Sequence, residues 1–174
     1  EGIRTDIKVV NLSLFNTDWY IDQMKRASYE AMPIPSSLEH DDYRTGTRDY
    51  TPIQERIKDY VEVEDVVGFI NSKSSKAKLN TSAGLRNYCP TKKLKITVNK
   101  DIAKTFVPEE HYDKIVDEVK FKLKGSGIFK NKLLVLDILA NFNWERPIYF
   151  AITVGRDNFM GLEKYFQLEG LAYR

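Results

Sequence analysis

The spacing of apolar positions along the chain predicts a mixture of strands and helices. A β-branched run over residues 6–14 predicts a buried strand, and the apolar stripe that follows Asp18 predicts a helix over residues 18–30. A capping pattern that starts at Thr51 predicts a short helix after it. Over residues 63–70, valines and an isoleucine recur at i, i+3, i+4 and i+7, which predicts an amphipathic helix.

The second half of the chain continues the mixture. Alternating apolar residues predict strands over residues 94–98 and 115–123, and the polar stretch 72–84 is typical of a loop or hairpin tip. Residues 131–140 are apolar on nearly every face, which predicts a central helix, and an interior strand is expected within 146–154, with a last one near the end. We therefore expect one α/β or mixed α+β domain over residues 1–174, with helices packed on a central mixed sheet.

Composition narrows the classes of partner. The chain has 174 residues, of which 42% are hydrophobic and 30% are charged, as in ordinary globular domains. A net charge of +2 is too small to favour nucleic acid as a partner, and we expect the basic runs 73–78 and 91–95 to be solvated faces. The single cysteine, Cys89, cannot form an internal disulfide.

The sequence predicts no metal site and no cofactor. Its two histidines, His40 and His111, lie beside acidic residues but lack the spacing from other ligands that holds a zinc ion. The short signatures of serine hydrolases and of nucleotide-binding loops are absent as well.

Asp137 is the one carboxylate within the apolar helix predicted for 131–140. Burial of an unpaired carboxylate is very costly, so this group must be neutralised, hydrogen-bonded or turned outward. Two interpretations stay open: a proton-transfer group with a raised pKa, or a polar helix edge that binds a neighbouring backbone group.

Polar and aromatic side chains follow three of the predicted elements. Those after the central helix fit a helix-to-strand joint, but Trp144 and Arg146 also suit a carbohydrate or carboxylate platform. Ligands of α/β sheets collect at the carboxyl ends of strands, so the three connectors are expected to share one edge. The predicted ligand-binding residues are Asp18, Trp19, Asn143, Trp144, Arg146, Arg156 and Asp157.

Four segments resemble a known family: "RTDIKVVNLSLFNTDWYIDQMKR", "YRTGTRDY", "NYCPTKKLKI" and "LDILANFNWERPIYFAITVGRDNFMGLEKYFQLEGLAYR". They are similar to the extracytoplasmic part of multi-spanning membrane proteins of Bacteroides-type bacteria, a family of unknown function. The membrane half of that family resembles protein O-mannosyltransferases of the GT-C class, whose catalytic acid lies in that half.

The resemblance implies a non-catalytic domain on the extracytoplasmic (periplasmic) face of the inner membrane, cut from a longer chain. Its partners would be its own membrane-embedded half and an acceptor polypeptide, a glycan or another protein. Two alternatives remain: a free-standing α/β enzyme with Asp137 or Asp18 as the acid/base, and a purely structural domain.

Overall fold

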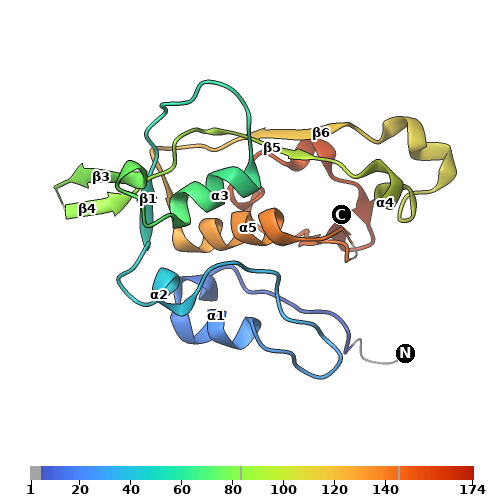
Figure 1. Cartoon of the computed structure of the whole chain (residues 1–174). Helices are drawn as coiled ribbons and strands as arrows, with labels where there is room; N and C mark the ends of the chain where they lie inside the picture. The colour runs from blue at the N-terminus through green and yellow to red at the C-terminus, as the bar shows by residue number, and fades with distance from the viewer. Residues whose placement is uncertain (1–4, 83, 145) are drawn as a thin grey trace.

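A computed structural model describes residues 5–82, 84–144 and 146–174. The fold is mixed α+β, as the sequence predicts. The N-terminal residues 5–43 form a layer on one side of α5, and α3 with the three-stranded sheet lies on the other side (Figure 1). The α-helices are α1 (Asp18–Met24), α2 (His40–Tyr43), α3 (Val63–Asn71), α4 (Lys100–Lys104) and α5 (Lys130–Asn141). The 3-10 helices are η1 (Leu14–Asn16), η2 (Ser75–Ala77), η3 (Glu109–Lys114), η4 (Arg156–Asn158) and η5 (Glu163–Tyr165).

The strands are divided among small sheets in the described part of the chain. The mixed sheet has the order β2-β5-β6, with β2 parallel to β5 and β5 antiparallel to β6. The remaining strands form the pair β1-β7, the hairpin β3-β4 and the sheet β8-β10-β9. Their bounds are β1 Tyr50–Pro52, β2 Val61–Glu62, β3 Lys78–Thr81, β4 Gly84–Asn87, β5 Lys93–Thr97, β6 Glu118–Lys122, β7 Gly127–Phe129, β8 Phe150–Ala151, β9 Leu168–Glu169 and β10 Ala172–Tyr173.

Helix α5 is the shared support of the molecule. Its Leu136 is 0% exposed and belongs to the apolar core between α3 and the mixed sheet. Leu134, also 0% exposed, belongs to a second core with Phe15 and Ile21 of the N-terminal layer. The nearly all-apolar sequence of this helix follows from its having a core on two sides.

Two sequence predictions are wrong because tertiary pairing prevails over local pattern. The segment 6–14 forms no strand: it runs beside α1, where the Asn11 N–H donates to the Tyr20 hydroxyl, and then enters η1. The capping pattern at Thr51 starts no helix, since Thr51 pairs with Ile128 between β1 and β7. The predicted helix 18–30 ends at Met24, and the backbone turns between Ser28 and Ala31.

Other predictions are confirmed, with bounds that differ by one to three residues. The helices predicted over 63–70 and 131–140 correspond to α3 and α5, and the strands predicted over 94–98 and 115–123 correspond to β5 and β6. The expected interior strand within 146–154 is reduced to the two residues of β8, and the last strand is a two-stranded hairpin, β9-β10. None of the helices in the described residues has the length and apolarity that crossing a bilayer requires.

Candidate functional site

An open cleft of about 660 Å³ lies at the N-terminal end of α5. The β1-β7 pair, the first turn of α5 and the two 3-10 turns η1 and η4 contribute to it, so segments far apart in sequence meet there. Its lining residues are Asn16, Thr45, Asp49, Tyr50, Phe129, Asn131, Lys132 and Asn158.

Protein groups already satisfy the first backbone N–H groups of α5. The N–H of Lys130 donates to the Asp49 carbonyl at 3.2 Å, and the N–H of Asn131 donates to the Asn16 side-chain oxygen at 3.4 Å. The N–H of Lys132 donates to the Asn131 side-chain oxygen at 2.8 Å. The helix start is therefore occupied by internal acceptors, and the cleft offers side-chain groups to a ligand.

Several of those side-chain groups are available. Among the described residues, the Asn158 amide and the Lys132 ammonium make no side-chain hydrogen bond or ion pair, and the Asn131 amide nitrogen is also without an acceptor. The Asp49 carboxylate, in contrast, pairs at 2.5 Å with the ammonium of Lys130, which is 1% exposed. As the described residues form it, the cleft thus combines uncommitted amide donors and acceptors with the Lys132 ammonium, which is free of ion pairs.

Aromatic rings form the apolar wall of the cleft. Phe129 is 58% exposed and packs edge-on against its cross-strand neighbour Tyr50, with ring centroids 5.4 Å apart. The Tyr50 ring lies directly over Gly127, where an added Cβ would come within 2.1 Å of it. Only glycine leaves that space, so Gly127 sets the position of the aromatic wall.

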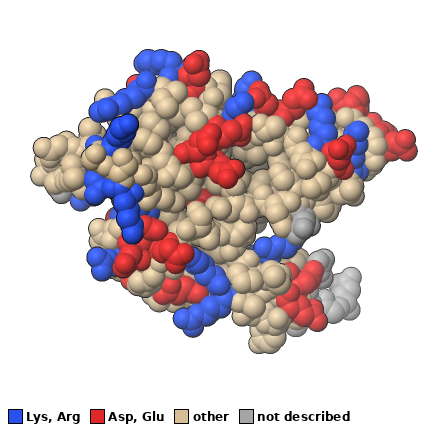
Figure 2. All heavy atoms as spheres, in the orientation of Figure 1, with Lys and Arg blue, Asp and Glu red and all other residues tan. Residues whose placement is uncertain are grey.

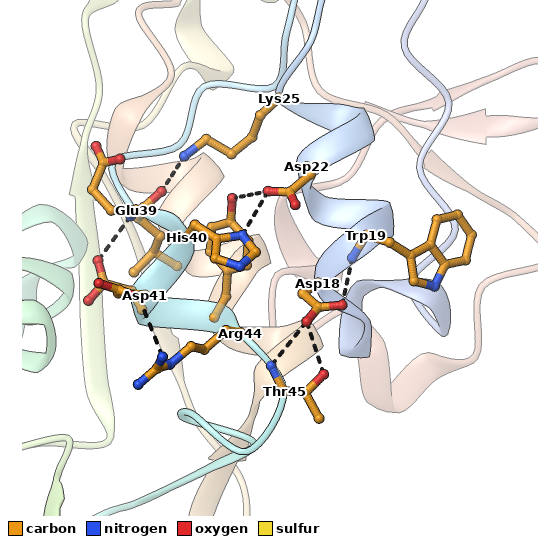
Figure 3. A network of polar contacts seen from close by, with 12 residues as sticks. Asp18, Trp19, Asp22, Lys25, Glu39, His40, Asp41, Arg44 and Thr45 are labelled. Carbon is orange, nitrogen blue, oxygen red and sulfur yellow. Dashed lines mark hydrogen bonds and ion pairs between the residues drawn. The ribbon is translucent and has the colours of Figure 1, made fainter.

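Asp18, a predicted ligand-binding residue, braces this region. Its carboxylate accepts hydrogen bonds from the Thr45 hydroxyl (3.0 Å) and the Thr45 N–H (3.3 Å), as Figure 3 shows. These bonds lower the pKa of Asp18 from its ordinary value. The Trp19 indole is 57% exposed and points away from these contacts (Figure 3). Asp18 thereby holds Thr45 at the cleft without lining it.

A second polar cluster joins α1 to α2. The Asp22 carboxylate accepts from the Tyr43 hydroxyl at 2.7 Å and lies 3.2 Å from the His40 ring nitrogen (Figure 3). The hydrogen bond from Tyr43 is the main cause of the lowered pKa of Asp22, and burial is the main cause of the raised pKa of Tyr43. Lys25 donates to the Leu38 carbonyl beside it. This cluster fixes the loop that precedes the cleft.

Two of the three predicted connectors meet at this end of α5. Arg156 and Asp157 line a small hollow next to the main cleft, and Lys132 contributes to both. With Asn16 and Asn158, the connectors that contain Asp18 and Asp157 therefore share one edge.

The third connector lies at the opposite end of α5, about 18 Å away along a helix of this length. Trp144 packs on Phe142 with centroids 4.5 Å apart, and it adopts a left-handed φ of 64°. Arg146 donates to the Pro33 carbonyl at 3.0 Å, and Asn143 is exposed. The structure does not bring these residues to the cleft, and a ligand-binding role for them stays a prediction.

Asp137 is fully buried and ties the N-terminal layer to α5. Its carboxylate accepts from the hydroxyls of Ser36 (2.5 Å) and Ser37 (2.6 Å), from the Ser37 N–H, and from the Asn141 amide (2.9 Å). These contacts come from the segment of Ser36 and Ser37 and from the next turn of α5, which supports the interpretation that Asp137 binds a neighbouring backbone segment. With Asp137 0% exposed, the acid/base alternative stays a prediction.

In the described residues, no three His, Cys, Asp or Glu side chains gather as metal ligands would.

The family model described as TMEM260-associated domain 2 matches residues 1–174. No curated protein and no solved structure matches the chain significantly.

Proposed function

The chain belongs to the TMEM260-associated domain 2 family, and on that premise we propose that it is a non-catalytic domain of an O-mannosyltransferase-like membrane protein that binds a glycan-bearing acceptor. The domain would lie on the extracytoplasmic side, and its closest partner would be its own membrane-embedded half. The observation that carries the proposal is the cleft at the start of α5, with its free amides beside an exposed ring.

The chemistry of the cleft suits a hydroxyl-rich ligand. Side-chain amides donate and accept at once, as sugar hydroxyls do, and Asn131 and Asn158 offer two of them. The Phe129 ring can cover the apolar face of a sugar or a short side chain of a peptide. Lys132 adds a cation for an acidic neighbour in the acceptor. Around Asp137, by contrast, the hydroxyls of Ser36 and Ser37 already donate to the carboxylate.

Binding to a mannosylated threonine peptide, measured by calorimetry, tests the proposal. The chain should bind this peptide more tightly than the unmodified peptide. Phe129→Ala and Asn158→Ala should each weaken binding by about tenfold, the effect of losing one contact worth about 1.4 kcal/mol. Trp19→Ala is the matched control, because Trp19 is as exposed as Phe129 but lies outside the cleft.

Equal losses in the Phe129 and Trp19 variants would place the ligand elsewhere. No binding of either peptide would favour the purely structural alternative, in which the domain only supports the membrane half.

A further inference from the structure

The outer face of the mixed sheet carries a cluster of lysines. In the antiparallel register, Lys93 of β5 lies directly opposite Lys122 of β6, and Lys95 lies opposite Lys120. Like charges placed directly opposite each other destabilise a sheet unless another charge compensates them. The two pairs differ in whether such compensation is present.

The inner pair is compensated. The Glu118 carboxylate contacts the ammonium groups of Lys120 (2.5 Å) and Lys95 (2.6 Å), and Glu62 adds a contact to Lys95 at 3.4 Å. The charges of these two lysines are therefore largely neutralised within the sheet and contribute little to binding a partner.

The outer pair has no carboxylate contact within 4.0 Å in the described residues. The Lys93 ammonium lies 5.8 Å from the centre of the Tyr60 ring. Lys58, Lys92 and Lys122 all act electrostatically on one acid, Glu55, and only Lys92 contacts it, at 3.2 Å. Three lysines thus share the Glu55 carboxylate, and Lys93 has no carboxylate contact among the described residues, which leaves an excess of positive charge on this face.

The loop beside these lysines exposes apolar surface. Ile57 is 40% exposed and Tyr60 is 39% exposed, and the Ile57 N–H donates to the Pro90 carbonyl, next to the lysine run. Tyrosine and isoleucine beside lysines form the combination that settles at the boundary between lipid headgroups and acyl chains. In Figure 2, acidic residues of the visible face gather over α3, around α4 and over the N-terminal layer that holds α1 and α2.

We propose that this lysine face (Lys58, Lys92, Lys93 and Lys122, with Ile57 and Tyr60) docks on an anionic lipid surface. Lysine ammoniums are compact point charges that suit a diffuse layer of headgroups, whereas recognition of carboxylates in a peptide favours the fork of arginine. The nearby Arg56 is already stacked over Tyr88, 5.1 Å from its ring centre. Because the chain belongs to a family of domains associated with a membrane protein, a lipid surface would lie near it. The lysine face is separate from the cleft, so this proposal does not depend on the proposed function.

Vesicle co-sedimentation of the chain tests the proposal. The chain should bind vesicles of phosphatidylcholine with phosphatidylglycerol, fail to bind phosphatidylcholine alone, and be released by added salt. Substitution of Lys58, Lys93 and Lys122 by Gln should weaken binding by about 100-fold, since each lysine near an anionic membrane contributes about fivefold. Within the described part of the chain these three lysines form no ion pair, so the melting temperature should hold.

The matched control removes the same charge from the other basic run, with Lys73, Lys76 and Lys78 replaced by Gln. An equal loss in the control would show that only net charge matters and would overturn the proposal. Salt-insensitive binding, or no binding to the anionic vesicles, would do the same. If the chain binds polyglutamate but not vesicles, and the triple lysine variant loses that binding, the partner of this face would be an acidic polypeptide. If the triple variant unfolds, Lys122→Gln alone should still weaken binding about fivefold.

Discussion

The two sides of α5 are held in different ways. On the sheet side, a large apolar core joins α3, α5 and the mixed sheet, and it holds Val66, Leu94 and Leu136. On the N-terminal side the apolar core is smaller, and hydrogen-bonded carboxylates complete the attachment: Asp18 to Thr45, Asp22 to Tyr43, and Asp137 to two serines.

The difference shows how a layer with little secondary structure keeps its place. Helices α1 and α2 have only 7 and 4 residues, too short to be stable alone. Directional hydrogen bonds to buried or half-buried carboxylates fix the loops between them. The cleft lies where the two kinds of attachment meet, so its shape depends on both.

Replacement of Asp137 by Ala should give the largest loss of stability that is confined to the N-terminal side of α5. The loss of its hydrogen bonds to Ser36 and Ser37 should cost about 2–4 kcal/mol and loosen the N-terminal layer. Its neighbour Leu136 is the matched site for the other side, where Leu136→Ala should cost about 2–5 kcal/mol. Hydrogen exchange should rise first in α1 for the Asp137 variant and first in β5 for the Leu136 variant. The same exchange pattern in both variants would contradict two separate modes of attachment.

On the sheet side, substitutions at two glycines distinguish the effect of side-chain packing on stability from the effect of backbone flexibility. Gly127→Ala should lower stability by about 1–3 kcal/mol, because the new Cβ meets the Tyr50 ring. Gly68→Ala should raise stability by about 0.5–1 kcal/mol, since Gly68 lies inside α3 with nothing within 4 Å of an added Cβ. Urea unfolding of both variants checks the opposite signs. A destabilised Gly68 variant would show that this face of α3 is more crowded than the structure shows.

Acid should weaken the two sides through different carboxylates. Lys120 and Lys95 lower the pKa of Glu118 from 4.5 to about 2. Because the folded-state pKa is the lower one, the contribution of Glu118 is present above pH 4.5 and is lost as the pH falls toward 2. Glu118→Gln should therefore lower the melting temperature at neutral pH but change it little near pH 2. Asp22→Asn, where the hydrogen bond from Tyr43 lowers the pKa, should act in the same direction on the N-terminal side. If the difference in melting temperature between the wild type and Glu118→Gln is the same at neutral and at acid pH, Glu118 does not contribute in this way.

Arg146→Ala should have the smallest effect. Among the described residues the exposed guanidinium donates one hydrogen bond, to the Pro33 carbonyl, so its loss should cost no more than about 1 kcal/mol. Trp144→Ala, which removes the contact with Phe142, provides the comparison at the same end of α5. Loss of peptide binding with an unchanged melting temperature in either variant would make this end a ligand site. Loss of folding would make it a helix-to-strand joint.

The sequence predicts the parts of the fold that a single segment determines. The period of Val63, Val66, Val67 and Ile70 locates α3, and the apolar run around Asp137 locates α5. Strand 6–14 was predicted from its β-branched residues, but a strand also needs a partner edge, which lies elsewhere in the chain and leaves no local trace.

The cleft could be predicted only in part. The prediction that connectors gather at one edge brings Asp18 and Asp157 to the correct end of α5, while Trp144 lies at the other end because it follows the helix instead of preceding it. Phe129 and Asn131 were missed. Their signal is the segment "GIFKN", in which a strand passes directly into a helix and leaves its last aromatic residue exposed.

An NMR titration of the uniformly 15N-labelled chain with the mannosylated threonine peptide tests most directly whether the cleft binds the acceptor. A ligand in the cleft should shift the amide signals of residues 16, 45, 129–132 and 158, with little change at 142–146. Changes confined to 142–146 would contradict it and return the ligand site to Trp144 and Arg146.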